Sequence, residues 1–127
     1  MQYCLVHEDD AVFGCEVDHI IGAKHGGATD AENLAYACAF CNRAKGSDFG
    51  SVVPRTGRCV RFFSPRTDRW AEHFPLNGVT IVPLLDIGEV TTRILDFNNS
   101  DRLLERQTIQ AVGRYPSAVV ARMASRT

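Results

Sequence analysis

Short apolar segments separated by glycines and polar residues organise the first 49 residues of the chain. Residues 17–21 are apolar and β-branched around an acid–histidine pair, which predicts a short strand that glycines end. Residues 34–38 predict a second strand, and residues 39–45 have the composition of a helix that ends at Gly46. Strand, loop, strand and helix is the order of a ββα unit.

The second half of the chain alternates turns with short apolar segments. Residues 53–57 and 64–68 have the composition of turns on either side of a strand at 59–63. Alternating residues in 79–83 and 89–95 predict a β-hairpin. This half therefore favours small strand pairs over a large sheet.

A further helix is predicted from Asp101 to about Val112, with Asn99 or Ser100 as its cap. Helical spacing predicts an apolar stripe on this helix formed by Leu104, Thr108 and Val112. Residues 117–127 have the composition of another helix or a loose tail.

Length and composition fit one α+β domain spanning residues 1–127. Hydrophobic residues make up 45% of the chain and charged residues 23%, which is ordinary for a soluble protein. We expect a ββα core in residues 1–49. Residues 50–127, with the hairpin and the last helix, are expected to pack on that core as a platform.

No segment of the sequence predicts export or a membrane. No apolar run approaches the roughly twenty residues that cross a bilayer. No basic region followed by an apolar stretch opens the chain, so a signal peptide is not expected. The five cysteines are an odd number, which argues against a disulfide framework. We therefore expect a cytoplasmic, reducing location with thiols free to bind metal.

Five chemically active residues lie in a short stretch in the order Asp18, His19, Asn33, Asn42 and Lys45. Hydrolysis of a phosphodiester needs an activated water and a sink for negative charge. His19 can take the proton of the water. Asp18 and Asn42 offer oxygens to a divalent metal that clamps the phosphate. Asn42 and Lys45 share one helix face, so Lys45 is expected to add a point charge against the phosphate.

The motifs Asp-His-Ile, Asn and Cys-x-x-Cys-Asn-x-x-Lys-Gly resemble those of the HNH endonuclease family. The resemblance implies a ββα-metal, treble-clef-like core and metal-dependent hydrolysis of DNA with Mg²⁺ or Mn²⁺. It implies that Asn33 braces the loop and aims the histidine, without binding metal. The third motif position, often histidine in the family, is Asn42 here and keeps an oxygen ligand. Residues 65–74 resemble the C-terminal region of compact stand-alone bacterial members.

Cysteines at Cys38 and Cys41 form half of a zinc knuckle. In zinc-bearing HNH proteins a second Cys-x-x-Cys precedes the first motif. Cys4 matches the second cysteine of that pair, and Met1 stands in the place of the first. We therefore expect a structural zinc held by Cys4, Cys38 and Cys41. Its fourth ligand is either a cysteine upstream of a truncated start, or His7, Cys15 or a water.

The remaining cysteines and histidines have ordinary interpretations. Cys15 and Cys59 are expected to be small buried hydrophobic residues. His25 lies between the motif halves and could reach a phosphate. His73 is expected to be a satisfied histidine packed beside Trp70 and Phe74.

Charge is distributed unevenly along the chain although the net charge is only −1. Residues 1–34 carry seven acids and one lysine, whereas residues 42–69 carry seven cations against two acids. This cationic run predicts a surface for the nucleic-acid backbone formed by Arg43, Arg55, Arg58 and Arg61. The alternative is a solvated arginine face that balances the acidic segment.

Two other functions compete with that of a nuclease. One is a non-catalytic, zinc-dependent nucleic-acid-binding module, and the other is a subunit whose incomplete zinc site is completed by a partner. Binding alone requires none of Asp18, His19 and Asn42, so their joint presence favours the enzyme.

Overall fold

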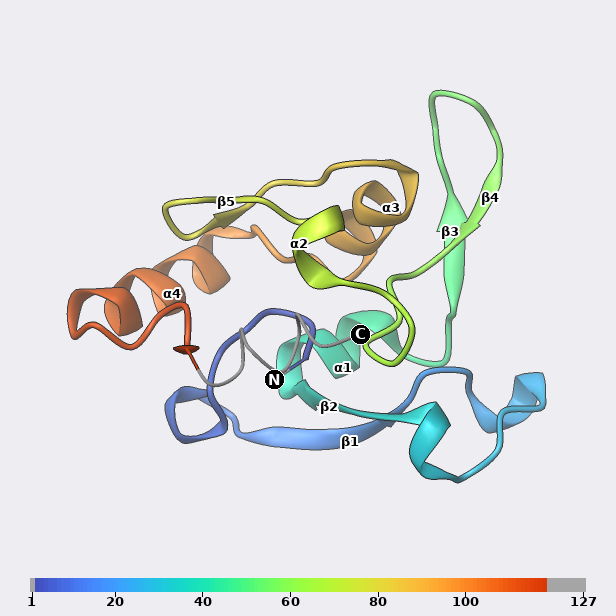
Figure 1. Cartoon of the computed structure of the whole chain (residues 1–127), viewed down its shortest axis with the longest axis horizontal. Coiled ribbons are helices and arrows are strands. Elements are labelled where there is room, and N and C mark those ends of the chain that lie inside the picture. The colour runs from blue at the N-terminus through green and yellow to red at the C-terminus, as the bar shows by residue number, and fades with distance from the viewer. Residues whose placement is uncertain (1, 119–127) are drawn as a thin grey trace.

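A computed structural model describes residues 2–118 as a mixed α+β fold with three small antiparallel strand pairs and four α-helices (Figure 1). The first half contains, in order, the 3-10 helix η1 (Glu8–Asp10), β1 (Cys15–His19), η2 (Ala23–His25), η3 (Ala31–Asn33), β2 (Leu34–Cys38) and α1 (Ala39–Lys45). The second half contains β3 (Gly50–Val52), β4 (Cys59–Arg61), α2 (Trp70–His73), β5 (Leu76–Asn77), β6 (Thr80–Ile81), α3 (Asp86–Ile94) and α4 (Ser100–Ala111).

The predicted ββα unit is present in the first half. β1 pairs antiparallel with β2, so that Asp18 lies opposite Ala35. α1 follows β2 without a loop because Cys38 is both the last strand residue and the helix cap, its sulfur accepting the backbone N–H of Cys41. The helix ends at Gly46, whose φ of +55° favours glycine.

The hairpin predicted at 79–83 and 89–95 is wrong in its second arm, which is helix α3. Val90 and Thr91 are buried on this helix, and the Thr91 hydroxyl accepts the backbone N–H of Phe63 at 2.8 Å. Gly88 lets α3 approach α2 closely, since a Cβ there would lie 2.4 Å from the His73 carbonyl oxygen. The true hairpin is β5–β6, which turns through Gly78.

Helix α4 starts where the sequence predicts, with the Asn99 side chain accepting the N–H of Arg102 at 3.0 Å. The predicted apolar stripe is wrong. Leu104 is 62% exposed and Val112 71% exposed, and Thr108 is exposed as well. The face turned inward instead presents Arg102, Arg106 and Ile109. Residues 119–127, most of the predicted last helix or tail, lie outside the described residues.

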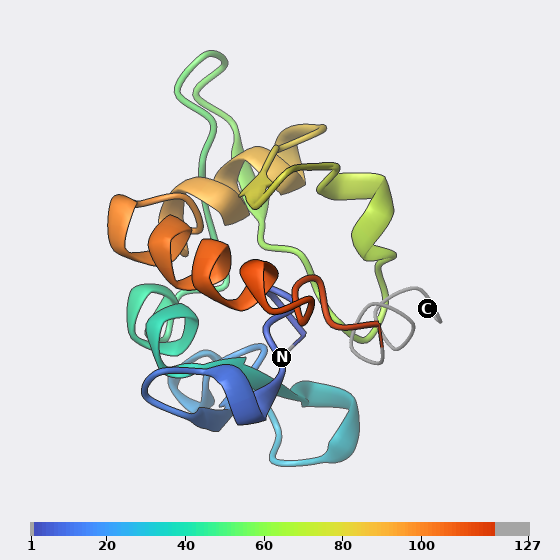
Figure 2. The same ribbon diagram turned by 90° about the vertical axis from the view of Figure 1, so that its left-hand side faces the viewer.

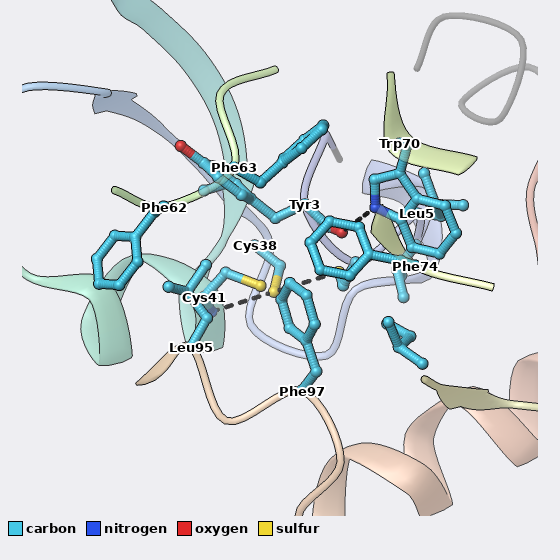
Figure 3. Close-up of a cluster of buried hydrophobic side chains, with 14 of the residues drawn as sticks. Tyr3, Leu5, Cys38, Cys41, Phe62, Phe63, Trp70, Phe74, Leu95 and Phe97 are labelled. Atoms are coloured by element: carbon cyan, nitrogen blue, oxygen red, sulfur yellow. Dashed lines mark hydrogen bonds between the residues drawn. The ribbon is translucent and has the colours of Figure 1, made fainter. Parts of the chain in front are cut away.

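One hydrophobic cluster joins the two halves of the chain around the buried N-terminal segment 3–6 (Figure 3). The indole N–H of Trp70 donates to the Tyr3 carbonyl oxygen at 2.7 Å. The Tyr115 hydroxyl donates to the carbonyl oxygen of Cys4 at 2.8 Å. In two views the C-terminal half lies over the ββα unit (Figures 1 and 2). Within residues 2–118, none of the helices is both long and apolar enough to cross a membrane.

The β3–β4 hairpin projects away from the rest of the molecule (Figures 1 and 2). Its turn falls at residues 53–57, as predicted, with Gly57 donating its N–H to the Val53 carbonyl oxygen. Cys59 lies on this projecting arm and is exposed, so its prediction as a buried residue is wrong. Cys15, on β1, is half-buried.

Candidate active site and cysteine cluster

Three residues from the sequence motifs line one pocket of about 350 Å³ in the first half of the chain. Asp18 and His19 reach it from the end of β1, and Asn42 reaches it from α1. The rest of its lining is small or apolar and consists of Val17, Gly22, Ala23, Gly46 and Ser47. The ββα unit thus brings together an acid, a histidine and an amide that are up to 24 residues apart in sequence.

Two parallel side-chain contacts tie β1 to α1 at this pocket. Glu16 and Asp18 are two apart on a strand and share its helix-facing side, while Asn42 and Lys45 are three apart on the helix. The Asn42 amide donates to the Glu16 carboxylate, and the Lys45 ammonium lies 3.1 Å from an Asp18 carboxylate oxygen. Sequence reasoning missed Glu16, although its strand spacing from Asp18 was the signal for it.

Lys45 lies inside the protein, only 1% exposed. Its Nζ donates to the His19 carbonyl oxygen at 2.9 Å and pairs with Asp18. The structure therefore places the ammonium behind the site, not open to an incoming phosphate as the sequence predicted.

Asp18 is itself buried between two donors. The Tyr3 hydroxyl reaches the same Asp18 oxygen as Lys45, at 3.5 Å. Burial raises the pKa of the Asp18 carboxyl, with Lys45 and Tyr3 acting in the opposite direction. Burial also raises the pKa of the Tyr3 phenol, which keeps that hydroxyl protonated as a donor.

The His19 ring is oriented by a residue that the sequence did not single out. His19 Nε2 lies 2.9 Å from the Thr29 hydroxyl oxygen. Its Nδ1 has no hydrogen-bond partner among residues 2–118. In the tautomer in which Nε2 carries the proton and donates to Thr29, Nδ1 is open to accept a proton.

Asn33 braces the loop that carries Thr29. Its side chain accepts the N–H of Ile21 at 2.9 Å and donates to the carbonyl oxygens of Ile21 and Ala28 at 2.9 and 2.8 Å. Gly27 lies so close that a Cβ would be 1.8 Å from the Ile21 carbonyl oxygen. His25, the other histidine of the loop, instead packs its ring against Phe49 at 4.8 Å.

The donor set at the pocket fits a hard divalent cation. One carboxylate oxygen of Asp18 and the amide oxygen of Asn42 have no hydrogen-bond partner among the described residues. Glu16 adds a further carboxylate beside Asn42. Such all-oxygen sets suit Mg²⁺ or Mn²⁺.

A second donor cluster, made of sulfur, lies in the core. The Sγ atoms of Cys4, Cys38 and Cys41 all lie within 4.8 Å of one another, and all three residues are buried. Cys4 and Cys38 have their sulfurs 3.7 Å apart. Tetrahedral zinc with Zn–S bonds of ~2.3 Å separates its sulfurs by ~3.8 Å, so the three thiols fit zinc.

Neither described candidate for a fourth ligand joins this cluster. His7 Nδ1 caps η1 by accepting the N–H of Asp9, and the Cys15 thiol donates to Glu8 at 3.7 Å. Residue 1 lies outside the described residues.

The surroundings of the three thiols shift their pKa values in different directions. Hydrogen bonding with Cys38 and Cys41 lowers the pKa of the Cys4 thiol. Burial raises the pKa of the Cys41 thiol, and hydrogen bonding with Cys4 raises that of Cys38.

The four predicted backbone-binding arginines lie in different settings. Arg43 on α1 stacks over the Phe13 ring at 6.0 Å, and Arg61 makes two hydrogen bonds to Asp68 at 2.6 and 2.9 Å. Arg55 lies in the turn of the β3–β4 hairpin, and Arg58 lies between that turn and β4. Arg55 pairs at 3.3 Å with an acid of α3, whereas the exposed Arg58 side chain has no partner among residues 2–118.

Comparison with known proteins gives one match. Residues 2–48, which contain the pocket residues and the three clustered cysteines, match the family model described as HNH endonuclease. No curated protein and no solved structure matches the chain at a significant level.

Proposed function

Because residues 2–48 form an HNH endonuclease domain, we propose that the protein is a metal-dependent endonuclease that hydrolyses phosphodiester bonds in DNA. The domain itself indicates a nuclease-type or nucleic-acid-related function. The observation that carries the finer proposal is the pocket in which His19 lies beside Asp18 and Asn42.

His19 is the general base in this proposal. Thr29 holds one ring nitrogen, so that Nδ1 is left to accept the proton of a water that attacks phosphorus. Asn33 is a positioning residue in this proposal, because its three hydrogen bonds hold the loop that positions Thr29.

Asp18 and Asn42, helped by Glu16, are the residues that would hold Mg²⁺ or Mn²⁺. When bound, such an ion supplies positive charge to the phosphate and to the leaving oxygen. Lys45 and Tyr3 fix the Asp18 carboxylate from behind, which makes Lys45 a positioning residue in this proposal. A site held in place before the substrate arrives avoids reorganisation during the reaction.

Cys4, Cys38 and Cys41 would hold a structural zinc. Two of them flank the first turn of α1, so a bound zinc would stabilise the start of the helix that carries Asn42 and Lys45. The five cysteines are free thiols, which fits the proposed reducing, cytoplasmic compartment.

The DNA backbone would be met first by the projecting β3–β4 hairpin, through Arg55 and Arg58. Arg43 and Arg61 remain secondary members of this proposed surface, because Arg43 stacks on the Phe13 ring and Arg61 holds Asp68 through two hydrogen bonds, whereas Arg55 has a single contact to its acid.

The proposal is tested by nicking of supercoiled plasmid with His19→Ala. The variant is expected to lose ~10²–10⁴-fold in Mg²⁺-dependent cleavage, the usual contribution of a general base. Zinc content and thermal stability should stay at the parent values. His25→Ala is the matched control, since His25 lies in the same loop and contacts only Phe49 among the described rings.

Cleavage by His19→Ala at the parent rate would refute the assigned mechanism. A parent protein that binds DNA but does not cut it with Mg²⁺ or Mn²⁺ would instead support the non-catalytic binding module.

A further inference from the structure

An arginine from the second half of the chain reaches into the cysteine cluster. Arg102, in the first turn of α4, is only 1% exposed. Its Nη2 donates to the Cys41 sulfur at 2.9 Å and to the Cys38 sulfur at 3.4 Å. The family match ends at residue 48, so this contact comes from outside the matched segment.

The guanidinium is held firmly on its other sides. Its Nη1 donates to the Leu95 carbonyl oxygen at 2.7 Å. Arg102 lies over the rings of Phe40 and Phe97, at 5.6 and 5.7 Å from their centroids. Figure 3 shows the sulfurs of Cys38 and Cys41 beside the Phe97 ring inside the core.

A cation buried in this way requires a counter-charge. The hydrogen-bond acceptors of the Arg102 side chain are backbone carbonyls and sulfurs, with no carboxylate among them in residues 2–118. Its Nε is buried with no partner among these residues. The sulfurs are therefore the only source of negative charge that its hydrogen bonds reach in the described part of the chain.

Charge counting separates a three-cysteine site from a four-cysteine site. Three thiolates around a divalent zinc leave one surplus negative charge, and four leave two. One guanidinium neutralises the three-cysteine site completely but the four-cysteine site only in part. The single positive charge of Arg102 therefore equals the surplus negative charge of a site with three cysteines, which is the number in the described cluster.

We propose that Arg102 is the outer-sphere partner of a three-cysteine zinc site formed by Cys4, Cys38 and Cys41. Its charge neutralises the surplus thiolate charge, and its hydrogen bonds fix the sulfurs of Cys38 and Cys41. The site then joins α4 to α1. This inference rests on the zinc role proposed for the cysteines, and not on nuclease activity.

The test compares two buried arginines on one helix, in the full chain. Arg102→Met keeps much of the side-chain volume but removes the charge and the bonds to sulfur. Arg106→Met is the matched control, because Arg106 is 0% exposed and bonds to Val79 and Asn98, with no cysteine among its hydrogen-bond partners in the described residues. Zinc affinity is measured by competition with a chelator, and Co²⁺ substitution reports on the metal–sulfur bonds by absorption.

Arg102→Met is expected to lower zinc affinity by ~10–100-fold, the usual effect of removing an outer-sphere partner of a metal ligand. The Co²⁺–thiolate absorption should shift in position or intensity in this variant. Arg106→Met should lose thermal stability yet keep the parent zinc affinity. Arg102→Lys, which keeps the charge but has a single donor group, should lie between parent and Arg102→Met.

Parent-like zinc affinity in folded Arg102→Met would overturn the proposal. If Arg102→Met does not fold, Arg102→Lys decides: reduced affinity supports the proposal and parent-like affinity refutes it. A parent protein that binds neither Zn²⁺ nor Co²⁺ would refute both this inference and the zinc role. Inactivity of a zinc-loaded parent would refute only the nuclease proposal.

Discussion

Among single residues, long cationic side chains differ most from the positions expected from the sequence. Lys45, Arg102 and Arg106 are among the largest fully buried side chains in the described chain. Sequence reasoning places such residues at the surface, because burying an unpaired charge is unfavourable. Each is buried here because it reaches carbonyl oxygens, a carboxylate or thiol sulfurs. The carboxylate, the sulfurs and the carbonyl oxygens of His19 and Val79 come from distant segments, so no local pattern could have predicted these contacts.

Lys45→Met tests the buried pair with Asp18. We expect the free energy of unfolding to fall by about 3–5 kcal/mol, because the Asp18 carboxylate stays buried without its cation. Urea unfolding of zinc-loaded protein measures this loss. Lys24→Met, which removes an exposed lysine, is the control and should leave stability unchanged.

The stability loss in Lys45→Met should depend on pH. Burial already raises the folded-state pKa of Asp18, and removal of Lys45 takes away an effect that lowers it. When an acid has a higher pKa in the folded than in the unfolded state, its contribution to stability is complete below the unfolded-state pKa. That contribution is lost as the pH rises through the folded-state pKa. The loss in Lys45→Met should therefore shrink as the pH is lowered. Parent-like stability at neutral pH would show that the pair contributes nothing.

At the scale of the elements, local signals predicted the first half well and the second half poorly. β2 and α1 begin and end at the predicted residues, because glycine, cap and alternation signals all lie inside the segment itself. The segment 89–95 carries β-branched residues that favour a strand. It forms a helix because Gly88 and Thr91 make contacts with α2 and with Phe63, which a local pattern does not contain.

In the candidate site, too, residues with a local motif were predicted and residues without one were missed. His19, Asp18 and Asn42 were predicted together because their motif is short and the ββα unit is local. Glu16 and Thr29 were missed because single carboxylates and hydroxyls carry no motif of their own.

Gly27→Ala tests the loop between β1 and β2. The added Cβ would overlap the Ile21 carbonyl oxygen and come within 2.8 Å of the Asn33 amide nitrogen. We expect nicking to fall by more than ~10-fold as Thr29 and His19 are displaced. Zinc content should be kept, because the cysteine cluster lies elsewhere.

Gly26→Ala is the matched control for this loop. Gly26 has a φ of +87°, but nothing lies within 4 Å of an added Cβ. It should cost about 1 kcal/mol of stability through backbone strain, with a smaller effect on nicking. Equal activity losses in the two variants would show that strain alone, and not the crowded Asn33 brace, controls the site.

For the whole molecule, the division of the chain into a nuclease-like segment and a platform is less sharp than the sequence predicts. The N-terminal residues run through the common core, and the platform supplies Arg102 to the cysteine cluster. The β3–β4 hairpin is the exception, since it projects beyond that core (Figure 1). It carries Arg55 and Arg58, two of the four arginines of the proposed DNA surface.

Arg58→Ala tests that surface. We expect weaker DNA binding, with the slope of log affinity against log salt concentration reduced by about 1, as for one lost phosphate contact. Arg114→Ala is the control, because the Arg114 side chain is exposed but already bonded to the Asp10 carboxylate. Binding curves at several salt concentrations give both slopes. Identical slopes for parent and Arg58→Ala would remove Arg58 from the DNA surface.

The contact between Arg102 and the cysteines also orders events during synthesis of the chain. Ribosomes add ~5–20 residues per second, and N-terminal segments emerge first. Cys4, Cys38 and Cys41 are therefore exposed well before α4 has been made. Zinc that arrives in this interval meets three thiols without the cation that balances them. The segment that matches the HNH family model is made first, yet a residue outside it reaches its cysteine cluster last.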